Sequence, residues 1–527
     1  MKKKVLIGLS WPYANGRLHI GHVASSLPAD VLARFHRSIG NDVSFVTGSD
    51  CYGTPILVQA AAEKMSPEDL ADKYHKLFVQ DFGLLGFTFD NYTKTMSSDH
   101  HKFVSQFHRE MYTGDYIYEK TAPQLYCEKC NKYLPDRYVE GTCPYCKKEA
   151  KGDSCDHCGK MLEPEDLVDP KCKLCNGKPV VRDTTQLYLK LSALQPKIQK
   201  FFDERKSTWT QNAQGLTQRY LNEGLHDRAI TRSIEWGIPV PREKWGDKRI
   251  YIWAENVLGY LSASKPEFIK EKENLLHYYV HAKDNIPFHS IILPGLIMAN
   301  SKTEYHLPDM IVSSEYVTIE GHKISKSKGN VLTAEELLKV FNPDMIRYYF
   351  LRQAAAKSDL NFTFENFVNI INGELVNKFG NLVNRTLSLI KNKLDDGVAL
   401  NPEYSLSGGK SYRINRAKTK INDFLSAGQV SRALDCAMDI VDYGNKMLDI
   451  DKPWYTVNKN PEKCKQDLST IISIIHSATV LLEPFIPFAC QKILKWFDSA
   501  NKFADVEVLF PRLDPKEIKE KFERYIK

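Results

Sequence analysis

The first part of the chain alternates short apolar runs with longer segments whose apolar residues recur at helical spacing. "KVLIGLS", from Lys4, predicts a buried strand, "HIGHVASSLPADVLARFHRSIG" predicts a helix that ends at Gly40, and "DVSFVTGSD" predicts a second strand. A strand, a helix and a strand in this order are typical of a doubly wound parallel sheet, an α/β fold. Ligands of such sheets bind at the carboxyl ends of the strands, where "WPYANGRLHIGH" leaves the first strand.

The strand pattern stops and then returns after a long interval. Strand signals reappear in "RIYIWAE" (249–255), "HYYVHA" (277–282) and "DMIVSSEYVTI" (309–319), and after Asn361 the apolar positions follow helical spacing only. An insertion therefore splits the sheet, and a helical region follows it. We expect these boundaries: 1–120 and 223–318 for the two halves of the sheet domain, 121–222 for the insertion, 319–365 for a connecting region and 366–527 for the helical region.

Composition and charge add little to this picture. A chain of 527 residues is too long to fold around one compact core. Its composition, with 43% hydrophobic and 26% charged residues, is ordinary for a soluble globular protein. The formal net charge of +7 permits a polyanionic partner without requiring one. The apolar run near the N-terminus ends at Ser10, and the apolar zone 471–489 is interrupted by prolines. We therefore expect no membrane segment and a cytoplasmic protein.

Eight of the twelve cysteines form four C-x-x-C pairs within residues 127–175. Two such pairs supply a tetrahedral set of four thiolates, which suits structural Zn²⁺. A redox role is the alternative, but four pairs clustered in a Gly- and Pro-containing segment with few large apolar residues favour metal. The short spacing of the middle pairs predicts nested pairing, with Cys143, Cys146, Cys155 and Cys158 in the inner site and Cys127, Cys130, Cys172 and Cys175 in the outer site.

His19 and His22 bracket Gly21 at the start of the first predicted helix. They could be two surface histidines. However, the N-terminus of a helix after a strand favours phosphate, Gly21 lets a nucleotide approach the backbone, and imidazoles can donate to phosphate oxygens. A second basic cluster, "GHKISKSKGN" at 321–330, alone predicts only a solvated loop. The two clusters together favour a nucleotide site with a loop that closes over pyrophosphate.

These residues carry a resemblance to a known family. "HIGH" and "KISKS" resemble the two signatures of class I aminoacyl-tRNA synthetases. "PYANGRLHIGH", the four cysteine pairs, "WGIPVP", "AKDNIPFH" and "NKFGNLVNR" together resemble the methionyl-tRNA synthetase family in its two-zinc form, over nearly the whole chain. The resemblance implies a Rossmann-like sheet split by a zinc-knuckle insertion, a lysine-containing signature loop with a stem-contact region in 319–365, and an all-α anticodon-binding bundle.

The resemblance also implies the activity. ATP would activate L-methionine to methionyl-adenylate, with Mg²⁺ on the phosphates, and the methionyl group would pass to the 3′ end of tRNA(Met). The implied catalytic residues are His19, His22, Lys323, Lys326 and Arg232. The implied ATP contacts are His19, Gly21, His22, Asp284, Val317 and Lys326.

A pocket for methionine must be aromatic and apolar, because a thioether carries no charge and forms weak hydrogen bonds. The family's pocket positions map onto Trp11, Tyr13, Asp50, Trp253, Tyr260 and His289, with Asp50 holding the substrate ammonium. Trp253 and Tyr260 could otherwise be core residues. "WAENVLGY" departs from the family, since Asn256 and Val257 stand where small residues or proline are common, and Trp11 replaces a commoner leucine.

The anticodon contacts of the family map onto Asn381, Arg385 and Trp454 in the helical region. Asn381 and Arg385 are four residues apart and share a helix face, and Trp454 follows Pro453 at a helix break. Trp454 could instead be a core residue. The chain resembles family members without an appended C-terminal module, so we expect a monomer.

Three other classes of protein compete with this interpretation. Leucyl, isoleucyl and valyl enzymes need an editing insertion for which no segment has room, and cysteinyl enzymes use zinc to bind substrate, whereas these cysteines form full ligand sets. A smaller nucleotidyltransferase shares H-x-G-H but needs neither the insertion nor the helical region. A non-catalytic RNA-binding protein predicts no methionine-dependent pyrophosphate exchange, so that assay separates it from a synthetase.

Overall fold

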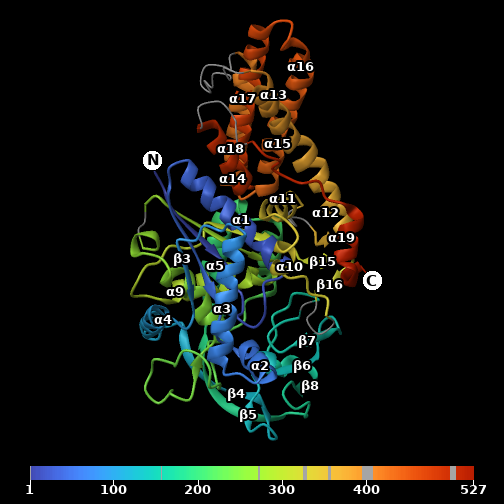
Figure 1. The fold of residues 1–527 in the computed structure, drawn as a ribbon. Coiled ribbons are helices and arrows are strands. Elements are labelled where there is room, and N and C mark those ends of the chain that lie inside the picture. Colours follow the sequence, from blue (N-terminus) through green and yellow to red (C-terminus); the bar gives the residue numbers. More distant parts are fainter. Residues whose placement is uncertain are drawn as a thin grey trace. The chain divides into compact units, whose positions relative to one another are not determined.

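The computed structural model describes residues 2–155, 157–270, 273–324, 329–353, 358–394, 408–498 and 506–526 (Figure 1). The chain divides into two compact units, and each is assembled from three separate segments. The first unit comprises 1–17, 40–80 and 89–313, and the second comprises 18–39, 81–88 and 314–527.

The first unit is built on a five-stranded sheet in which the order of the strands reverses at β1. The strand order is β14-β13-β1-β2-β3, and β1 pairs in parallel with both β13 and β2. The strands are β1 (Lys4–Leu9), β2 (Asp42–Ser49), β3 (Asn91–Lys94), β13 (Leu275–Ala282) and β14 (Met310–Ser314). This parallel α/β architecture is the predicted one, and the carboxyl end of β1 is therefore the position at which ligands are expected to bind.

Two predicted strands differ in the structure. Residues 249–255 form only a two-residue strand, β12 (Arg249–Ile250), and then a short helix, α7 (Ile252–Glu255). A short apolar run does not distinguish a buried strand from a buried helix, and here Ile252 and Ala254 are buried on a helical turn. Residues 309–319 split into β14 and β15 (Val317–Ile319), which belong to different sheets.

The insertion contains two small antiparallel sheets. One has the order β10-β9-β4-β5 and the other β7-β6-β8. The strands are β4 (Ile117–Cys127), β5 (Lys132–Tyr133), β6 (Val139–Thr142), β7 (Glu149–Lys151), β8 (Val168–Cys172), β9 (Val180–Leu189) and β10 (Arg228–Ala229). The other helices of the first unit are α2 (Thr54–Glu63), α3 (Pro67–Leu84, which crosses the unit boundary), α4 (Ser98–Met111), α5 (Leu191–Arg205), α6 (Gln211–Glu223), α8 (Gly259–Ser262) and α9 (Leu293–Ala299).

The second unit is mainly helical and includes α1 (Ile20–Ser38), which follows β1 in the chain. A small sheet joins β15 to β16 (His322–Lys323) and β17 (Leu360–Phe362). The other helices are α10 (Ala334–Leu338), α11 (Pro343–Arg352), α12 (Phe364–Ile370), α13 (Asn381–Lys393), α14 (Gly409–Ser426), α15 (Val430–Asp451), α16 (Pro453–Thr456), α17 (Pro461–Leu482), α18 (Pro487–Asp498), α19 (Pro515–Lys521) and α20 (Glu523–Ile526). A π-helical segment (Ile371–Gly380) joins α12 to α13.

The apolar zone 471–489 behaves as predicted, because α17 ends at Leu482 and α18 begins at Pro487. Across the residues that the structure describes, no helix combines the length and the apolar character that crossing a membrane requires.

Candidate functional site

The carboxyl ends of β1 and β2 bring Tyr13 and Asp50 together. The two residues form a parallel bridge, in which the Ala14 N–H donates to the Asp50 carbonyl at 2.8 Å and the Asp50 N–H donates to the Pro12 carbonyl at 2.9 Å. The Asp50 side chain is buried, and burial raises its pKa well above the ordinary value; the nearby Glu255 carboxyl would raise it further wherever it is ionised. Asp50 is therefore an acid that ionises readily only when a cation lies beside it.

Tyr260 and His289 are joined in a buried hydrogen bond of 2.7 Å between the hydroxyl and Nε2. His289 Nδ1 lies 2.9 Å from the Asn285 carbonyl, which only accepts, so the imidazole proton lies on Nδ1 and the Tyr260 hydroxyl donates to Nε2. Burial lowers the pKa of His289 to about 4, which keeps the ring neutral. The pair is a fixed polar group in an otherwise aromatic wall.

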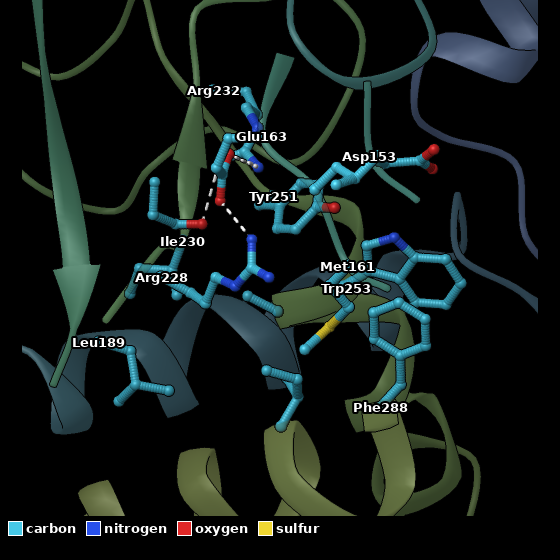
Figure 2. Close-up of a pocket in the computed structure, with 14 residues that line it drawn as sticks. Asp153, Met161, Glu163, Leu189, Arg228, Ile230, Arg232, Tyr251, Trp253 and Phe288 are labelled. Atoms are coloured by element: carbon cyan, nitrogen blue, oxygen red, sulfur yellow. Dashed lines mark hydrogen bonds and ion pairs between the residues drawn. The ribbon is translucent and has the colours of Figure 1, made fainter. Parts of the chain in front are cut away.

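Trp253 stacks on Phe288 with 3.6 Å between ring centroids and 7° between planes. Tyr13 meets the same indole edge to face at 6.1 Å. Figure 2 shows Trp253 and Phe288 side by side on a pocket of about 30 Å³, whose far side carries Arg232 and Glu163. Sequence reasoning missed Phe288, although it lies next to His289 in "AKDNIPFH". Its aromatic character beside a proposed pocket residue was the available signal.

Trp11 occupies a space left by two glycines. A Cβ on Gly48 would lie 2.6 Å from the Trp11 ring, and a Cβ on Gly259 would lie 2.7 Å from it. The indole also lies 5.8 Å from the His100 ring and 6.4 Å from the Tyr260 ring, between centroids. The buried Trp11 ring therefore fits only because Gly48 and Gly259 have no side chains. Gly259 is the glycine of "WAENVLGY", so a tryptophan at position 11 depends on that segment.

Arg232 is held by residues of the insertion. Its guanidinium donates to both oxygens of Asp136 at 3.1–3.3 Å and lies 3.8 Å above the centroid of the Tyr251 ring. Burial raises the pKa of Asp136 to about 6, and Arg232 opposes that rise. Arg228 pairs with Glu163 at 2.6 Å on the same side of the pocket (Figure 2). The Arg232–Asp136 ion pair joins strand β11 (Thr231–Arg232) to the cysteine-containing insertion, and the Arg228–Glu163 pair lies within the insertion, on β10.

The two histidines at the start of α1 cap the helix reciprocally. The Gly21 N–H donates to His19 Nδ1 and the His19 N–H donates to His22 Nδ1, both at 3.2 Å, and the rings lie 3.8 Å apart. With Nδ1 accepting, the proton of each neutral ring lies on Nε2. A Cβ on Gly21 would lie 3.0 Å from the His19 ring, so glycine permits this arrangement.

The second basic cluster lies close to the same helix in the second unit. His19 forms an antiparallel bridge with Thr333, the Ile20 N–H donates to the Leu332 carbonyl at 3.0 Å, and the Gly21 Cβ position is 3.6 Å from Ile324. Lys323 is exposed at the end of β16, and Val317 is buried at the start of β15. Lys326 lies outside the described residues. In the first unit, Asp284 is exposed and accepts a hydrogen bond from Asn285 at 3.1 Å.

The eight paired cysteines gather into the two nested groups expected from their spacing, each with its sulfur atoms within 4.8 Å of one another. Four sulfur-to-sulfur distances are 3.5, 3.9, 3.9 and 3.5 Å. A tetrahedral zinc with bonds of about 2.3 Å needs sulfur separations of about 3.8 Å, far beyond a disulfide. The donor set and its spacing therefore fit Zn²⁺.

The backbone repeats the same turn in all four knuckles. The residue after the second cysteine of each pair has a positive φ: 52° at Asn131, 60° at Lys147, 69° at Gly159 and 57° at Asn176. Asn and Gly tolerate this left-handed conformation best. The turn directs both thiols of a pair to one side, so the local sequence itself prepares the two groups of four sulfurs.

Of the three proposed anticodon contacts, Arg385 and Trp454 lie together in the second unit. The Arg385 guanidinium is 4.6 Å from the centroid of the half-buried Trp454 ring and 3.5 Å from an Asp449 oxygen. Asn381 is exposed at the start of α13, one turn before Arg385. Trp454 lies in α16, a short helix that follows Lys452 at a φ of 43°. The break in the helical chain thus leaves the indole partly exposed.

Known protein families and individual proteins match this chain over almost its entire length. Residues 5–387 match the family model for class I tRNA synthetases (M), and residues 411–515 match the model for the anticodon binding domain of methionyl tRNA ligase. The methionine–tRNA ligase 1 of Alkaliphilus oremlandii is 40% identical over 97% of this chain and 98% of its own length. A methionine–tRNA ligase of Bacillus mycoides is 39% identical over 99% of this chain and 98% of its own length.

The fold has a counterpart among solved structures. The methionyl-tRNA synthetase of Mycobacterium tuberculosis, solved in complex with methionyl-adenylate, aligns with a TM-score of 0.78. The alignment covers 97% of this chain and all of that one, at 23% sequence identity. At this level of identity the likeness concerns the fold.

Proposed function

This chain belongs to the methionine–tRNA ligases of the class I tRNA synthetases, and we propose how its own residues activate methionine and pass it to tRNA. The observation that carries the proposal is the cluster at the carboxyl ends of the strands, an aromatic wall around one buried acid. Tyr13, Trp253, Tyr260 and His289, with Trp11 behind them, form the wall that takes the thioether side chain. Asp50 takes the ammonium group.

The first step needs charge stabilisation rather than a covalent intermediate. The methionine carboxylate attacks the α-phosphorus of ATP, the bond to the departing pyrophosphate breaks, and methionyl-adenylate forms. His19 and His22 donate from Nε2 to phosphate oxygens as negative charge builds there. Lys323 and Lys326 stabilise the leaving pyrophosphate, and Gly21, Asp284 and Val317 contact ATP. Mg²⁺, bound with ATP, would add positive charge at the phosphates.

The resemblance implies a catalytic role for Arg232, and we propose that Arg232 acts in catalysis by positioning, since Asp136 and Tyr251 engage its guanidinium. Its contacts to Asp136 and Tyr251 hold the insertion to the strand that leads to Trp253, so the aromatic wall keeps its shape. In the second step the 3′-terminal hydroxyl of tRNA attacks the methionyl carbonyl, and AMP leaves.

Methionine-dependent exchange of pyrophosphate into ATP, measured without tRNA, tests the activation step. His22→Ala should lower the exchange rate by about 10²–10³, the usual loss for one stabilising donor. His226→Ala, which changes a histidine outside the proposed site, is the matched control and should exchange normally. A methionine-independent signal, or an unchanged rate in His22→Ala, would contradict the assignment.

We propose that both cysteine groups hold structural Zn²⁺. Among the described residues, four of the eleven members of the buried cluster in the insertion are the cysteines Cys127, Cys143, Cys155 and Cys172. Metal therefore replaces part of a hydrophobic core. Elemental analysis of metal-replete protein should find two zinc ions per chain; one or none would count against the nested pairing.

Anticodon recognition is proposed for Asn381, Arg385 and Trp454 within the region 366–527. A splayed base would stack on Trp454, and Arg385 and Asn381 would contact base edges. The match of 411–515 to an anticodon binding domain supports the location of Trp454, which lies inside that span, whereas Asn381 and Arg385 precede it. Trp454→Ala should reduce aminoacylation about ten- to a hundredfold, since stacking one base is worth about 1–3 kcal/mol.

The neighbouring Tyr455 offers a matched control. It is 65% exposed, so Tyr455→Ala removes an aromatic ring from the same short helix without opening a core. Pyrophosphate exchange without tRNA should stay near the parent value in both variants. Equal losses in exchange and aminoacylation would assign Trp454 to the fold instead. A monomeric state and a cytoplasmic location stay predictions, which sedimentation and cell fractionation test.

A further inference from the structure

A second buried acid, Glu255, lies beside the proposed amino-group site and has no role in the mechanism above. It closes α7, and its side chain is 1% exposed. Its Oε2 lies 2.7 Å from His100 Nε2, and the His100 side chain is equally buried. The His100 ring in turn lies 5.8 Å from Trp11. At first sight the contact is an ion pair, but its hydrogen bonds indicate otherwise.

The far side of His100 constrains its proton. His100 Nδ1 lies 2.8 Å from the Ser262 hydroxyl, and that hydroxyl donates to the Gly259 carbonyl at 3.0 Å. A hydroxyl has one hydrogen, so with that hydrogen on Gly259 the Ser262 oxygen accepts from His100 Nδ1–H. A neutral ring then has a bare Nε2, and the hydrogen in the 2.7 Å contact must come from Glu255.

The other oxygen of Glu255 supports the same protonation. Within the described part of the chain, Glu255 Oε1 receives no hydrogen bond, although it is buried. An ionised carboxylate with one buried oxygen lacking a donor is far more costly than a neutral acid in the same place. Burial also lowers the pKa of His100 to about 3 and raises that of Glu255 well above its ordinary value.

We propose that Glu255 is a positioning residue of the methionine site, a neutral acid whose O–H donates to His100 Nε2, so that of these two buried acids Asp50 alone offers a negative charge to the substrate ammonium. This inference rests on the proposed role of Asp50. With Glu255 neutral, the repulsion that opposes ionisation of Asp50 disappears. Among the described residues, Tyr52 is a further titratable group near Glu255; its backbone N–H donates to Asp50 Oδ1 at 3.2 Å and its hydroxyl lies 2.6 Å from His101 Nε2.

The variant Glu255→Gln distinguishes a neutral Glu255 from an ionised one. The amide has the same shape, and its NH₂ can donate to His100 Nε2 as the acid does. The KM for methionine in pyrophosphate exchange should change by less than about threefold, whereas loss of a nearby charge would raise it at least about tenfold. Glu255→Ala removes the donor and should raise KM, and rescue by Gln marks positioning through His100. Glu273→Gln, on the exposed surface, is the matched control.

Asp50→Asn tests the premise separately. It should raise the KM for methionine about a hundredfold or more, because it removes the proposed partner of the ammonium. A large effect of Asp50→Asn together with a tenfold effect of Glu255→Gln would overturn the inference and keep the role of Asp50. A negligible effect of Asp50→Asn would instead remove the proposed function of that residue.

Infrared spectroscopy of the intact enzyme with saturating methionine reads the protonation directly and needs no turnover. A protonated carboxyl group has a C=O stretch above the amide region. We expect such a band at neutral pH that disappears in Glu255→Gln and persists in Asp50→Asn. Absence of the band, or its loss in Asp50→Asn alone, would overturn the proposal even if a variant folds poorly.

Discussion

Each unit of this protein buries an acid next to a basic side chain, but the two acids differ in charge. Asp30, on α1 in the second unit, has an ion-pair partner in Arg347 at 2.7 Å, and both side chains are fully buried. Glu255, in the first unit, has His100 at the same distance and is equally hidden from water. The two acids are therefore buried to the same extent, and the difference in their charge must come from the hydrogen bonds around each of them.

Asp30 receives four donors. Arg347 and Arg34 donate at 2.7 and 2.9 Å, and the Thr88 amide and hydroxyl donate at 2.9 and 2.8 Å. These donors hold the pKa of Asp30 below its ordinary value although burial opposes them. Within the described residues the Glu255 side chain has one hydrogen-bond partner, His100, which accepts rather than donates. The comparison indicates that the number and type of partners, more than burial, decide whether an acid inside this protein is charged.

The largest effect should come from removing the cation of the second unit. Arg347 also donates to the carbonyls of Phe485, Leu85 and Pro484, so Arg347→Met leaves a buried charge and three carbonyls without their donor. We expect a loss of about 3–5 kcal/mol in the free energy of unfolding, measured with urea.

The double variant Asp30→Leu with Arg347→Met is the control for this prediction. It removes both charges together, so it should cost less than Arg347→Met alone. A single variant that loses under about 1 kcal/mol would show that the pair in the second unit is not charged, and the comparison would fail.

The second prediction concerns the pH dependence that Glu255 contributes. Its raised pKa means that the folded state holds a proton that the unfolded state has lost, so stability falls as pH rises above the ordinary pKa of glutamate. Above the ordinary pKa of glutamate, the advantage of Glu255→Gln over the parent should grow by up to about 1.4 kcal/mol per pH unit until the pH reaches the raised pKa of Glu255. Urea unfolding at several pH values measures the slope. Parallel curves for the two proteins would mean that Glu255 is ionised in both states.

The smallest effect should come from one donor to Asp30. Thr88→Val removes the hydroxyl and keeps the shape and the backbone amide, at a cost of about 1 kcal/mol. It should also raise the pKa of Asp30, so acid unfolding should begin at a higher pH than in the parent. The stability that Asp30 contributes is present at neutral pH and is lost as pH falls through its lowered pKa. If acid unfolding of Thr88→Val began at the same pH as in the parent, the Thr88 hydroxyl would not contribute to lowering the pKa of Asp30.

Sequence patterns predicted the features that depend on neighbouring residues. The strand from Lys4, the helix break near residue 484 and the two nested cysteine groups all follow from local periodicity or spacing. Residues 249–255 were misjudged because a short apolar run has no period that separates strand from helix. Glu255 and His100 form a contact although they are 155 positions apart in the sequence. The residues next to each of them give no sign of this contact. The grouping of α1 with residues 314–527 depends on tertiary packing in the same way.

The Asp30–Arg347 contact also has a consequence for how the chain matures on the ribosome. The two residues are 317 positions apart, and at about 5–20 residues per second the ribosome needs roughly 15–60 s to travel between them. During that interval Asp30 has Arg34 and Thr88 available as donors, but Arg347 has not yet been made. The native surroundings of α1, the helix that His19 caps, are therefore complete only late in synthesis, so a chain cut short by premature termination lacks the fully buried cation that pairs with Asp30.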